Sequence, residues 1–483
     1  MRPLGPTQLL ARSALYGFAG VAGKAAALLT VPFLARELGP QDYGLADLAT
    51  SAAALLVLAT SLSGDIPAAQ RAGQAASRSE RDMALRMYVA ATLGVSLVVA
   101  VLLVPLSGVI AEQAWASPSS TGLALLALLL VPISAVQASL ANVPRLLGNG
   151  RLFAGLSVVD LLGQLALAVL FVALGFGPTG VVLGFLVGSV FGLGAALWPA
   201  RHIIFGEVRW SIAWQTVRDG ARYLPALVLP LIADAVTRVV LANRMATADV
   251  GYFALAIRLA SVMSLVAGAF IAAYGPDLLA KTYSTAAARA FGRTFTTYAG
   301  ALIIASSLIA LLAPEVVSIA AGSAYRNASL ILPWLCAAGA AAGSYAALML
   351  AAGFSDRAGA VAWTASVGAF AQVVLAVALV GPIGVMAAGV APFVGQLLAL
   401  TLLTVVLAPR FPHASKVLLM LYFGGLVTLA AVALIAMELP TGVRFSGAAV
   451  VATVGIVMAH RALRASRPDY PGTTTDAQKP QVR

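Results

Sequence analysis

Charged residues are scarce in this chain of 483 residues. Asp, Glu, Lys and Arg make up 10% of it, whereas a soluble globular protein ordinarily carries about 25%. Apolar residues account for 61%, and the mean hydropathy is +0.95. The shortage of charge therefore excludes a soluble globular protein and predicts a membrane protein.

Cysteine and histidine are scarcer still. The chain has one cysteine, Cys336, which leaves no partner for an internal disulfide, and three histidines. No paired-cysteine or His-Glu-x-x-His spacing occurs, so we expect no metal site and no metal catalysis. Around Gly23-Lys24-Ala25, Phe18 and Ala25 replace the first glycine and the Ser/Thr of a nucleotide-binding loop. We therefore expect no cofactor, and energy from an ion gradient or from the substrate's own concentration difference.

The apolar residues fall in blocks of roughly twenty, the length of one membrane-spanning helix. We count fourteen such blocks, which predict an all-α polytopic membrane protein. Because the number is even, both termini lie on one side. The expected spans are residues 13-35, 43-64, 87-110, 121-143, 153-175, 180-198, 221-242, 250-273, 296-313, 328-352, 359-380, 384-408, 418-437 and 443-460.

Basic residues outnumber acidic ones, 30 to 18. With these spans, and with residues at the span ends counted with the adjoining loops, 23 of the 30 fall on the side of the termini, 3 lie inside spans, and 4 fall on the opposite side. Loops rich in Lys and Arg stay in the cytoplasm, so both termini are predicted to be cytoplasmic, in the inner (plasma) membrane. The net charge of +12 is explained by this face, and no nucleic-acid partner is expected.

The two halves of the chain repeat one another. Gly177-Pro178-Thr179-Gly180-Val181 recurs 204 residues later as Gly381-Pro382-Ile383-Gly384-Val385. With an offset of 207, Leu34, Ala35, Asp42, Gly44 and Ala49 match Leu241, Ala242, Asp249, Gly251 and Ala256. Six spans per repeat is an even number, so the halves share one orientation and are related by an axis along the membrane normal.

The repeat predicts two six-helix lobes that face a central site, followed by two further helices. The linker between the lobes carries Trp210, Trp214 and Val217 at helical spacing, with Arg209 and Arg218 elsewhere. This pattern is typical of a helix in the plane of the membrane surface; the alternative is a solvated linker with incidental tryptophans. The predicted division is N-lobe 1-198, amphipathic cytoplasmic linker 199-219, C-lobe 220-409, two last spans 410-463 and disordered cytoplasmic tail 464-483.

Three short segments carry a family resemblance. The string Leu38-Gly39-Pro40-Gln41-Asp42-Tyr43-Gly44, within 31-44, resembles the first hairpin of bacterial polysaccharide (O-antigen type) lipid flippases, in the multidrug/oligosaccharidyl-lipid/polysaccharide exporter superfamily. Residues 146-151 (Leu-Leu-Gly-Asn-Gly-Arg) resemble the family's short basic turn, and residues 322-325 (Gly-Ser-Ala-Tyr) its Gly-x-x-Tyr loop. The resemblance runs over most of residues 10-410.

This resemblance implies a cavity between two lobes and transport of a polyprenyl-pyrophosphate-linked glycan to the outer leaflet. The partners it implies are that lipid-linked glycan, membrane lipids and polysaccharide assembly proteins. A lipid II or multidrug exporter of the same superfamily is the alternative. A membrane glycosyltransferase or polysaccharide polymerase is disfavoured, because the extracytoplasmic loop 111-120 contains one acid, Glu112, and no Arg or Lys. We therefore expect that the protein is not an enzyme and has no catalytic residue.

Six ionisable residues lie inside the expected spans. At about 2.5 to 3.5 kcal/mol each at a helix centre, they must face water or one another rather than lipid. The cations are candidates for binding the substrate's pyrophosphate or acidic sugars, since guanidinium groups bind phosphate bidentately. The acids are candidates for lining the cavity or for binding a coupling ion. The cations are Lys24, Arg238 and Arg258, and the acids are Asp160, Asp234 and Asp47.

A structural role is the alternative for each of these residues. Depths estimated from the span ends suit ion pairs of Lys24 with Asp160 and of Asp234 with Arg258. Asp47, estimated to lie only about 6 Å below the outer boundary, is expected to be interfacial.

Overall fold

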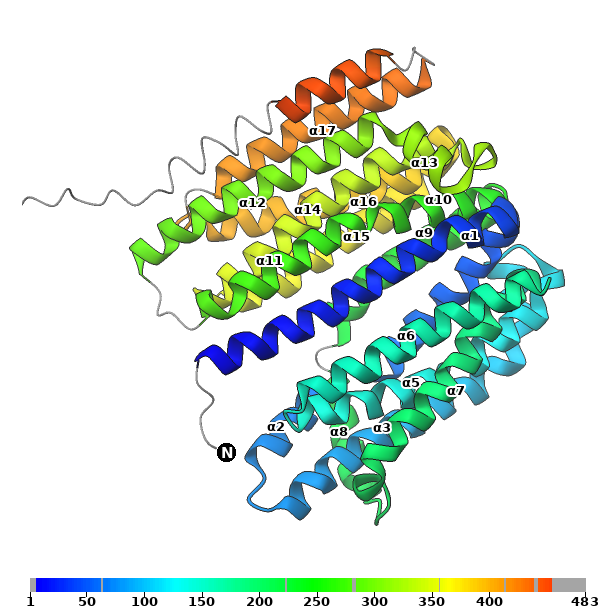
Figure 1. The fold of residues 1–483 in the computed structure, drawn as a ribbon, viewed down its shortest axis with the longest axis vertical. Helices are drawn as coiled ribbons and strands as arrows, with labels where there is room; N and C mark the ends of the chain where they lie inside the picture. Colours follow the sequence, from blue (N-terminus) through cyan, green and yellow to red (C-terminus); the bar gives the residue numbers. More distant parts are fainter. Residues whose placement is uncertain are drawn as a thin grey trace, which may run out of the picture.

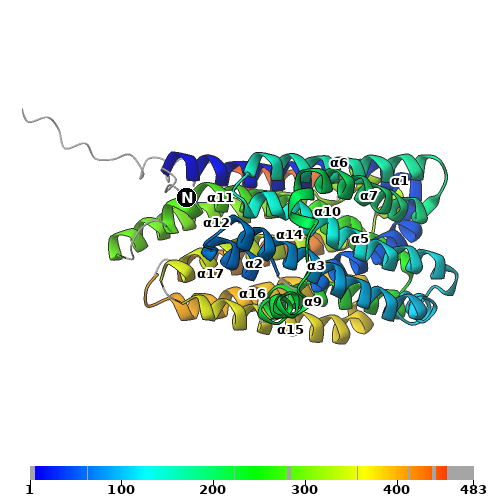
Figure 2. The ribbon, with the colours of Figure 1, turned by 90° about the horizontal axis from the view of Figure 1, so that it is seen from below.

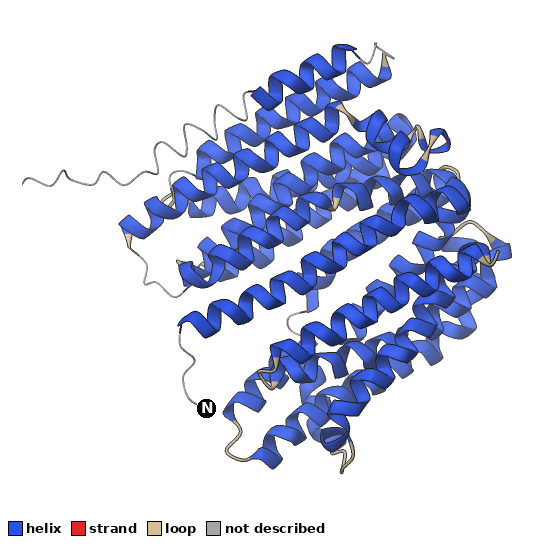
Figure 3. Ribbon diagram, in the orientation of Figure 1, coloured by secondary structure: helices blue, strands red, loops and turns tan. Residues whose placement is uncertain are grey.

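The computed structural model describes residues 6–61, 64–221, 224–279, 284–355, 357–411, 414–437 and 442–453. Within these ranges the chain is almost entirely helical and contains no strand (Figure 3). The all-α prediction is therefore confirmed. The predicted tail 464-483 and the last part of the fourteenth span lie outside the described residues.

The first half of the chain forms eight numbered α-helices and three short turns of 3-10 or π helix (Figure 1). The helices are α1 (Pro6–Ser61), α2 (Asp65–Gln74), α3 (Arg78–Leu103), α4 (Ser107–Val109), α5 (Thr121–Leu146), α6 (Gly150–Ala173), α7 (Gly177–Ile204) and α8 (Trp210–Ala221), and the short turns are η1 (Val104–Leu106), η2 (Ile110–Ala114) and η3 (Pro118–Ser120).

The second half begins at α9 and continues as antiparallel helices. The helices are α9 (Leu224–Arg244), α10 (Thr247–Ala260), α11 (Val262–Leu279), α12 (Thr285–Leu311), α13 (Ala313–Ala321), α14 (Ala328–Phe354), α15 (Ala358–Ile383), α16 (Ala387–Leu407) and α17 (Ala414–Ala436), with the short turns η4 (Ser323–Tyr325) and η5 (Gly384–Met386). Residues 442–453 are helical as well.

Ten segments of the described chain are long and apolar enough to cross a membrane. Two of them, Ala25–Gln74 and Gly359–Leu407, run for 50 and 49 residues, about twice the roughly 20 residues of one crossing. The first is interrupted at Gly39 and the second at η5. Over the residues that the structure describes, each of the fourteen predicted spans coincides with helix, and the protein is a multi-pass membrane protein.

The sharp kink in α1 has a local cause. Gly39 adopts φ 68°, a left-handed conformation that a side chain disfavours, and Pro40 follows without an N–H to donate. The string that carries the family resemblance is therefore the turn between two crossings. This end of the bundle, called the Gly39 end below, also holds the junction of α9 and α10.

The long helices pack in two groups that meet at α1 (Figure 1). One group contains α3, α5, α6 and α7, and the other contains α9 together with α11, α12 and α14 to α17. Helix α1 packs against α5 and α6 on one side and against α10 and α11 on the other. Viewed along the other axis, the helices of both groups lie roughly parallel (Figure 2).

Two glycines allow α1 and α10 to approach closely. A methyl group on Gly44 would lie 2.8 Å from the backbone nitrogen of Gly251, and a methyl on Gly251 would lie 2.8 Å from the carbonyl carbon of Pro40. Val250 and Phe253, beside this contact, are fully buried in the largest apolar cluster. The first hairpins of the two sequence repeats thus pack against each other.

The linker between the two halves of the chain contains a short amphipathic helix, α8. Helix α7 continues to Ile204, past the predicted span end at residue 198, and α8 follows. Ala213 and Thr216 are buried against the protein, whereas Trp210 and Trp214 are 63% and 66% exposed. On its buried side, α8 is held by Arg71 of α2, which contacts Asp219 and Thr216 at 2.6 Å.

Candidate functional site

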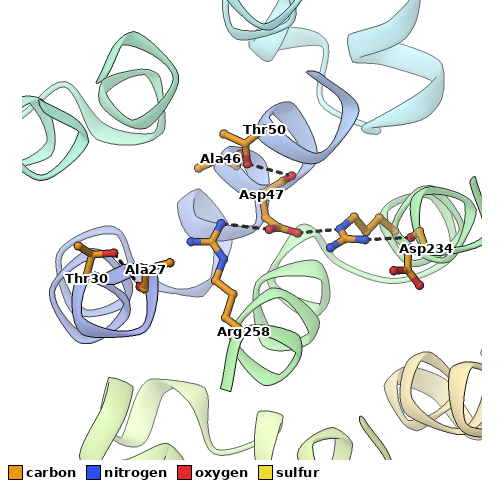
Figure 4. Close-up of polar contacts among 8 residues, drawn as sticks. Ala27, Thr30, Ala46, Asp47, Thr50, Asp234 and Arg258 are labelled. Carbon is orange, nitrogen blue, oxygen red and sulfur yellow. Dashed lines mark hydrogen bonds and ion pairs between the residues drawn. The ribbon is translucent and has the colours of Figure 1, made fainter. Parts of the chain in front are cut away.

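Asp47, Arg238 and Arg258 form an ion cluster where α1, α9 and α10 meet (Figure 4). Arg238 Nε donates to Asp47 Oδ2 at 2.8 Å, and Arg258 Nη2 donates to Asp47 Oδ1 at 3.3 Å. The partners are 191 and 211 residues apart in the chain. One carboxylate therefore bridges two guanidinium groups, and the three side chains together carry a net charge of +1.

The two arginines of this cluster differ in exposure. The side chains of Asp47 and Arg238 are 5% and 10% exposed, whereas that of Arg258 is 28% exposed. Each guanidinium also lies over an aromatic ring, Arg238 over Phe253 and Arg258 over Tyr43, both at 5.1 Å from the ring centre. Arg258 is therefore the most exposed member of the cluster, and its guanidinium contacts both Tyr43 and Asp47.

Asp234 lies beside this cluster without joining it through its carboxylate. Arg238 Nη1 donates to the backbone carbonyl of Asp234 at 3.1 Å, and Gln372 Nε2 of α15 donates to the Asp234 Oδ1 at 2.8 Å. The ion pair of Asp234 with Arg258, expected from matching depth, is wrong: Arg258 pairs with Asp47.

Asp47, expected to be interfacial near the outer end of its span, is buried within the protein with an exposure of 4%, and its depth in the membrane stays a prediction. The eight residues from Gly39 to Asp47 place it about 12 Å inside the Gly39 end at about 1.5 Å per residue. The close contact of α1 with α10 then covers it on the side that faces Arg258.

Asp160 belongs to a separate polar cluster in the other helix group. Gln164 Nε2 donates to Asp160 Oδ1 at 3.0 Å and lies 3.3 Å from Ser189 Oγ, which in turn lies 2.9 Å from Ser134 Oγ. A methyl group on Gly192 would lie 3.1 Å from the Asp160 carboxylate carbon, so α7 presses closely on this site. Among the described side chains Asp160 has no ion pair.

Lys24, the remaining candidate, lies in the first part of α1, but its side chain is outside the described residues. The predicted pairing of Lys24 with Asp160 therefore stays a prediction. Five of the six candidates are described: Asp47, Arg238 and Arg258 meet, Asp234 adjoins them, and Asp160 stands apart.

Sequence reasoning missed two contributors to the site. Gln372 is an amide in the middle of an apolar helix, and its polarity at that place is the signal that would have drawn attention to it. Tyr43 lies inside the family string but gave no sign of facing Arg258. Within the described ranges, no group of three or more His, Cys, Asp and Glu could hold a metal ion.

An apolar cavity opens on the other side of the C-terminal helix group. It has a volume of about 820 Å³ and lies between α12, α17 and the helical residues 442–453. Its lining is almost wholly apolar and includes Ile303, Ile304, Phe423, Leu426, Val427 and Val450.

Two features together define a polytopic helical membrane protein with an internal polar site: the described bundle has ten segments able to cross a membrane, in two groups of helices, and a buried cluster of charge lies where those groups meet. The comparison with family models makes this specific. Residues 33–330 match the model of the polysaccharide biosynthesis protein family, and the chain belongs to this family. No curated protein matches the chain in sequence.

Solved structures of transporters share the fold. The lipid II flippase MurJ, in an inward closed conformation, superposes with a TM-score of 0.68 over 93% of this chain and 100% of its own, at 13% identity. An inward-facing multidrug resistance MATE family transporter of the MOP superfamily gives 0.58 over 84% and 95%, at 15% identity. A Vibrio cholerae MATE transporter gives 0.55 over 88% and 96%, at 14% identity. The resemblance expected from the sequence is confirmed for the family and for the fold of this superfamily.

Proposed function

We propose that this protein flips a polyprenyl-pyrophosphate-linked oligosaccharide from the inner to the outer leaflet by alternating access, for cell-surface polysaccharide export. Membership of the polysaccharide biosynthesis family supports the glycan, and the flippase and transporter folds support the movement. The protein acts as a transporter and not as an enzyme in this proposal. Polysaccharide assembly proteins are its expected partners in the membrane.

The membrane placement is part of the proposal. The 23 to 4 distribution of basic residues supports cytoplasmic termini in the inner membrane. The Gly39 end then faces the outside. Two arginines at this end make contacts with neighbouring helices. Arg36 donates to the Ile319 carbonyl, and Arg444 forms an ion pair with Glu315 at 3.0 Å. Both contacts join the outer ends of neighbouring helices.

The main structural support for the proposal is that Arg258 is partly exposed and has N–H donors left for a ligand. A guanidinium has five N–H donors, and the bond to Asp47 uses one of them. With 28% of its side chain exposed, Arg258 can reach a phosphate oxygen without leaving Tyr43. Arg238 is more deeply buried and supports Arg258 through their shared carboxylate. Lys24 is proposed as a further cation that faces the same substrate.

The apolar cavity supports the lipid half of the substrate. A cavity of about 820 Å³ with an almost wholly apolar lining suits a hydrocarbon chain and offers nothing to a sugar. We propose that the polyprenyl tail lies there while the pyrophosphate contacts the arginines. The two arginines lie on α9 and α10, and the cavity is lined by α12, α17 and residues 442–453.

The aspartates are proposed to serve the energy coupling. Asp160 and Asp234 each accept a hydrogen bond from a glutamine amide, at 3.0 Å and 2.8 Å, and in the described chain neither carboxylate has an ion pair. Such a carboxylate can exchange a proton or a monovalent cation, because no arginine neutralises it permanently. Asp47 differs, since two arginines already hold it.

Flipping in proteoliposomes tests the proposal. Purified protein is reconstituted into liposomes with a polyprenyl-pyrophosphate oligosaccharide. Movement of this lipid to the outer leaflet is measured with a glycan-cleaving enzyme added outside the liposomes. Arg258→Gln should reduce the rate about tenfold or more, since a charge-assisted hydrogen bond is lost, and Arg258→Lys should recover part of it. The matched control Arg151→Gln changes an exposed arginine at the opposite end of the bundle and should leave the rate unchanged.

Lipid II export is the second candidate, favoured by the TM-score of 0.68 with the lipid II flippase MurJ. The same liposomes distinguish the two, because a flippase for surface polysaccharide should prefer its oligosaccharide-lipid over lipid II. Movement of lipid II without movement of the oligosaccharide-lipid would favour the second candidate.

A further inference from the structure

We propose that Asp47 is a resident anion that shields Arg258, so that only a pyrophosphate, and not a single phosphate or carboxylate, displaces it and thereby frees α1 from α10. The inference rests on the proposed function for its substrate class. It adds how the site selects its ligand and how binding is communicated to the Gly39 end.

The two helices contact each other along one face of each. On α1 this face carries Pro40, Gly44 and Asp47, spaced by four and three residues. On α10 it carries Gly251 and Arg258, spaced by seven residues. Positions three, four and seven apart share one side of a helix. The bond between Asp47 and Arg258 therefore lies on the same helix faces as the glycine contact, about one turn farther along α1 and two turns farther along α10.

The two bonds of Asp47 are unequal. The bond to Arg238 is 2.8 Å long and joins the two most buried side chains, whereas the bond to Arg258 is 3.3 Å long and its arginine is 28% exposed. The weaker, more solvated bond breaks first. When it breaks, Asp47 keeps its partner Arg238, so no charge is stranded in the interior.

This arrangement selects among anions by competition. A carboxylate or a monophosphate offers Arg258 about what Asp47 already provides, and gains little by exchange. A pyrophosphate brings two phosphate groups and more acceptor oxygens to a cluster whose net charge is +1, so it can accept more charge-assisted bonds from the exposed guanidinium than one carboxylate oxygen does. Its binding therefore replaces an interhelical bond with a bond to the ligand.

Anion binding to the purified protein tests the selection, with inorganic pyrophosphate and inorganic phosphate as probes in titration calorimetry. The wild-type protein should bind pyrophosphate about tenfold more tightly than phosphate, the fold-change of one charge-assisted bond. Arg258→Gln should lose binding of both. Retained pyrophosphate binding in Arg258→Gln, or equal affinities in the wild type, would overturn the proposal.

The double variant Asp47→Asn with Arg238→Gln isolates the role of Asp47. It removes the shielding carboxylate and its buried partner together, so that Arg258 stays charged and no buried charge is stranded. Phosphate should then bind about tenfold more tightly, and the preference for pyrophosphate should shrink. The matched control Glu112→Gln removes an exposed acid and should preserve the preference. An unchanged preference in the double variant would contradict the shielding role.

Cysteine labelling tests the communication to the Gly39 end. In a Cys336→Ala background, Ala254→Cys places a thiol on α10 between Gly251 and Arg258, where Ala254 is fully buried. Pyrophosphate should accelerate its maleimide labelling, whereas phosphate should not. Ala341→Cys, equally buried in α14, should stay protected under all conditions.

Pyrophosphate binding without faster labelling of the Ala254→Cys thiol would overturn the release of α1 from α10. Neither measurement uses a glycan lipid. Failure of glycan flipping with these results intact would therefore overturn the proposed function and leave this inference standing.

Discussion

Gly44 and Gly251 are equivalent residues of the two sequence repeats, and they contact each other in the folded protein. A methyl on Gly44 would lie 2.8 Å from the Gly251 nitrogen. The same residue type is therefore required twice, because each hairpin leaves room for the backbone of the other. This contact brings Asp47 within reach of Arg258.

Adding a methyl group at this contact should separate α1 from α10. We expect Gly251→Ala to lower the free energy of unfolding by about 1 to 3 kcal/mol, the usual cost of overpacking, measured by thermal unfolding in detergent. Gly155→Ala is the control, since nothing lies within 4 Å of a methyl there; this change should be neutral or slightly stabilising. A Gly251→Ala protein as stable as the control would mean that the contact is looser than described.

The ion cluster predicts an ordered series of stabilities. Arg238→Gln should cost about 3 to 5 kcal/mol, because it removes the closer of the two partners of a deeply buried carboxylate. Arg258→Gln should cost about 1 kcal/mol or less, since its side chain is partly solvated and Asp47 keeps Arg238. The double variant Asp47→Asn with Arg238→Gln should recover most of the loss of Arg238→Gln. Denaturation of the four proteins side by side gives the order, and a reversed ranking of the two arginine variants would contradict it.

Asp234→Asn and Asp160→Asn separate energy coupling from folding. An asparagine keeps a carbonyl oxygen that can accept from Gln372 or Gln164, so both variants should fold with near wild-type stability. If these carboxylates exchange a proton or cation, flipping should lose its dependence on the ion gradient. The measurement is the flipping rate in proteoliposomes with and without an imposed proton or sodium gradient. A full gradient response in both variants would exclude these aspartates from coupling.

Reporter fusions test the topology. A reporter at Ser79, in the first turn of α3, should read as cytoplasmic, whereas one at Ser117, in the loop before α5, should read as external. The reason is the 23 to 4 distribution of basic residues. A cytoplasmic reading at Ser117 would invert the predicted orientation and place the Gly39 end inside the cell.

The sequence by itself determined the class of this protein. The scarcity of charge and the regular apolar blocks fix a helical membrane bundle, because unpaired backbone groups cannot remain in lipid. The string from Leu38 to Gly44 indicated the polysaccharide biosynthesis family, whose family model matches residues 33–330. The intramembrane charges were visible too, because each is costly in lipid and must have a polar neighbour.

Only the tertiary structure decided which charges meet. Counting residues along a helix gives depth but not the direction in which a side chain faces, so depth paired Arg258 with Asp234 and assigned no partner to Asp47. The actual bond joins residues 211 positions apart, through a close approach that depends on two glycines. Gln372 likewise reaches Asp234 across 138 positions. Such contacts depend on how helices rotate and pack against one another, and that is decided by the packing of the whole bundle rather than by any local stretch of sequence.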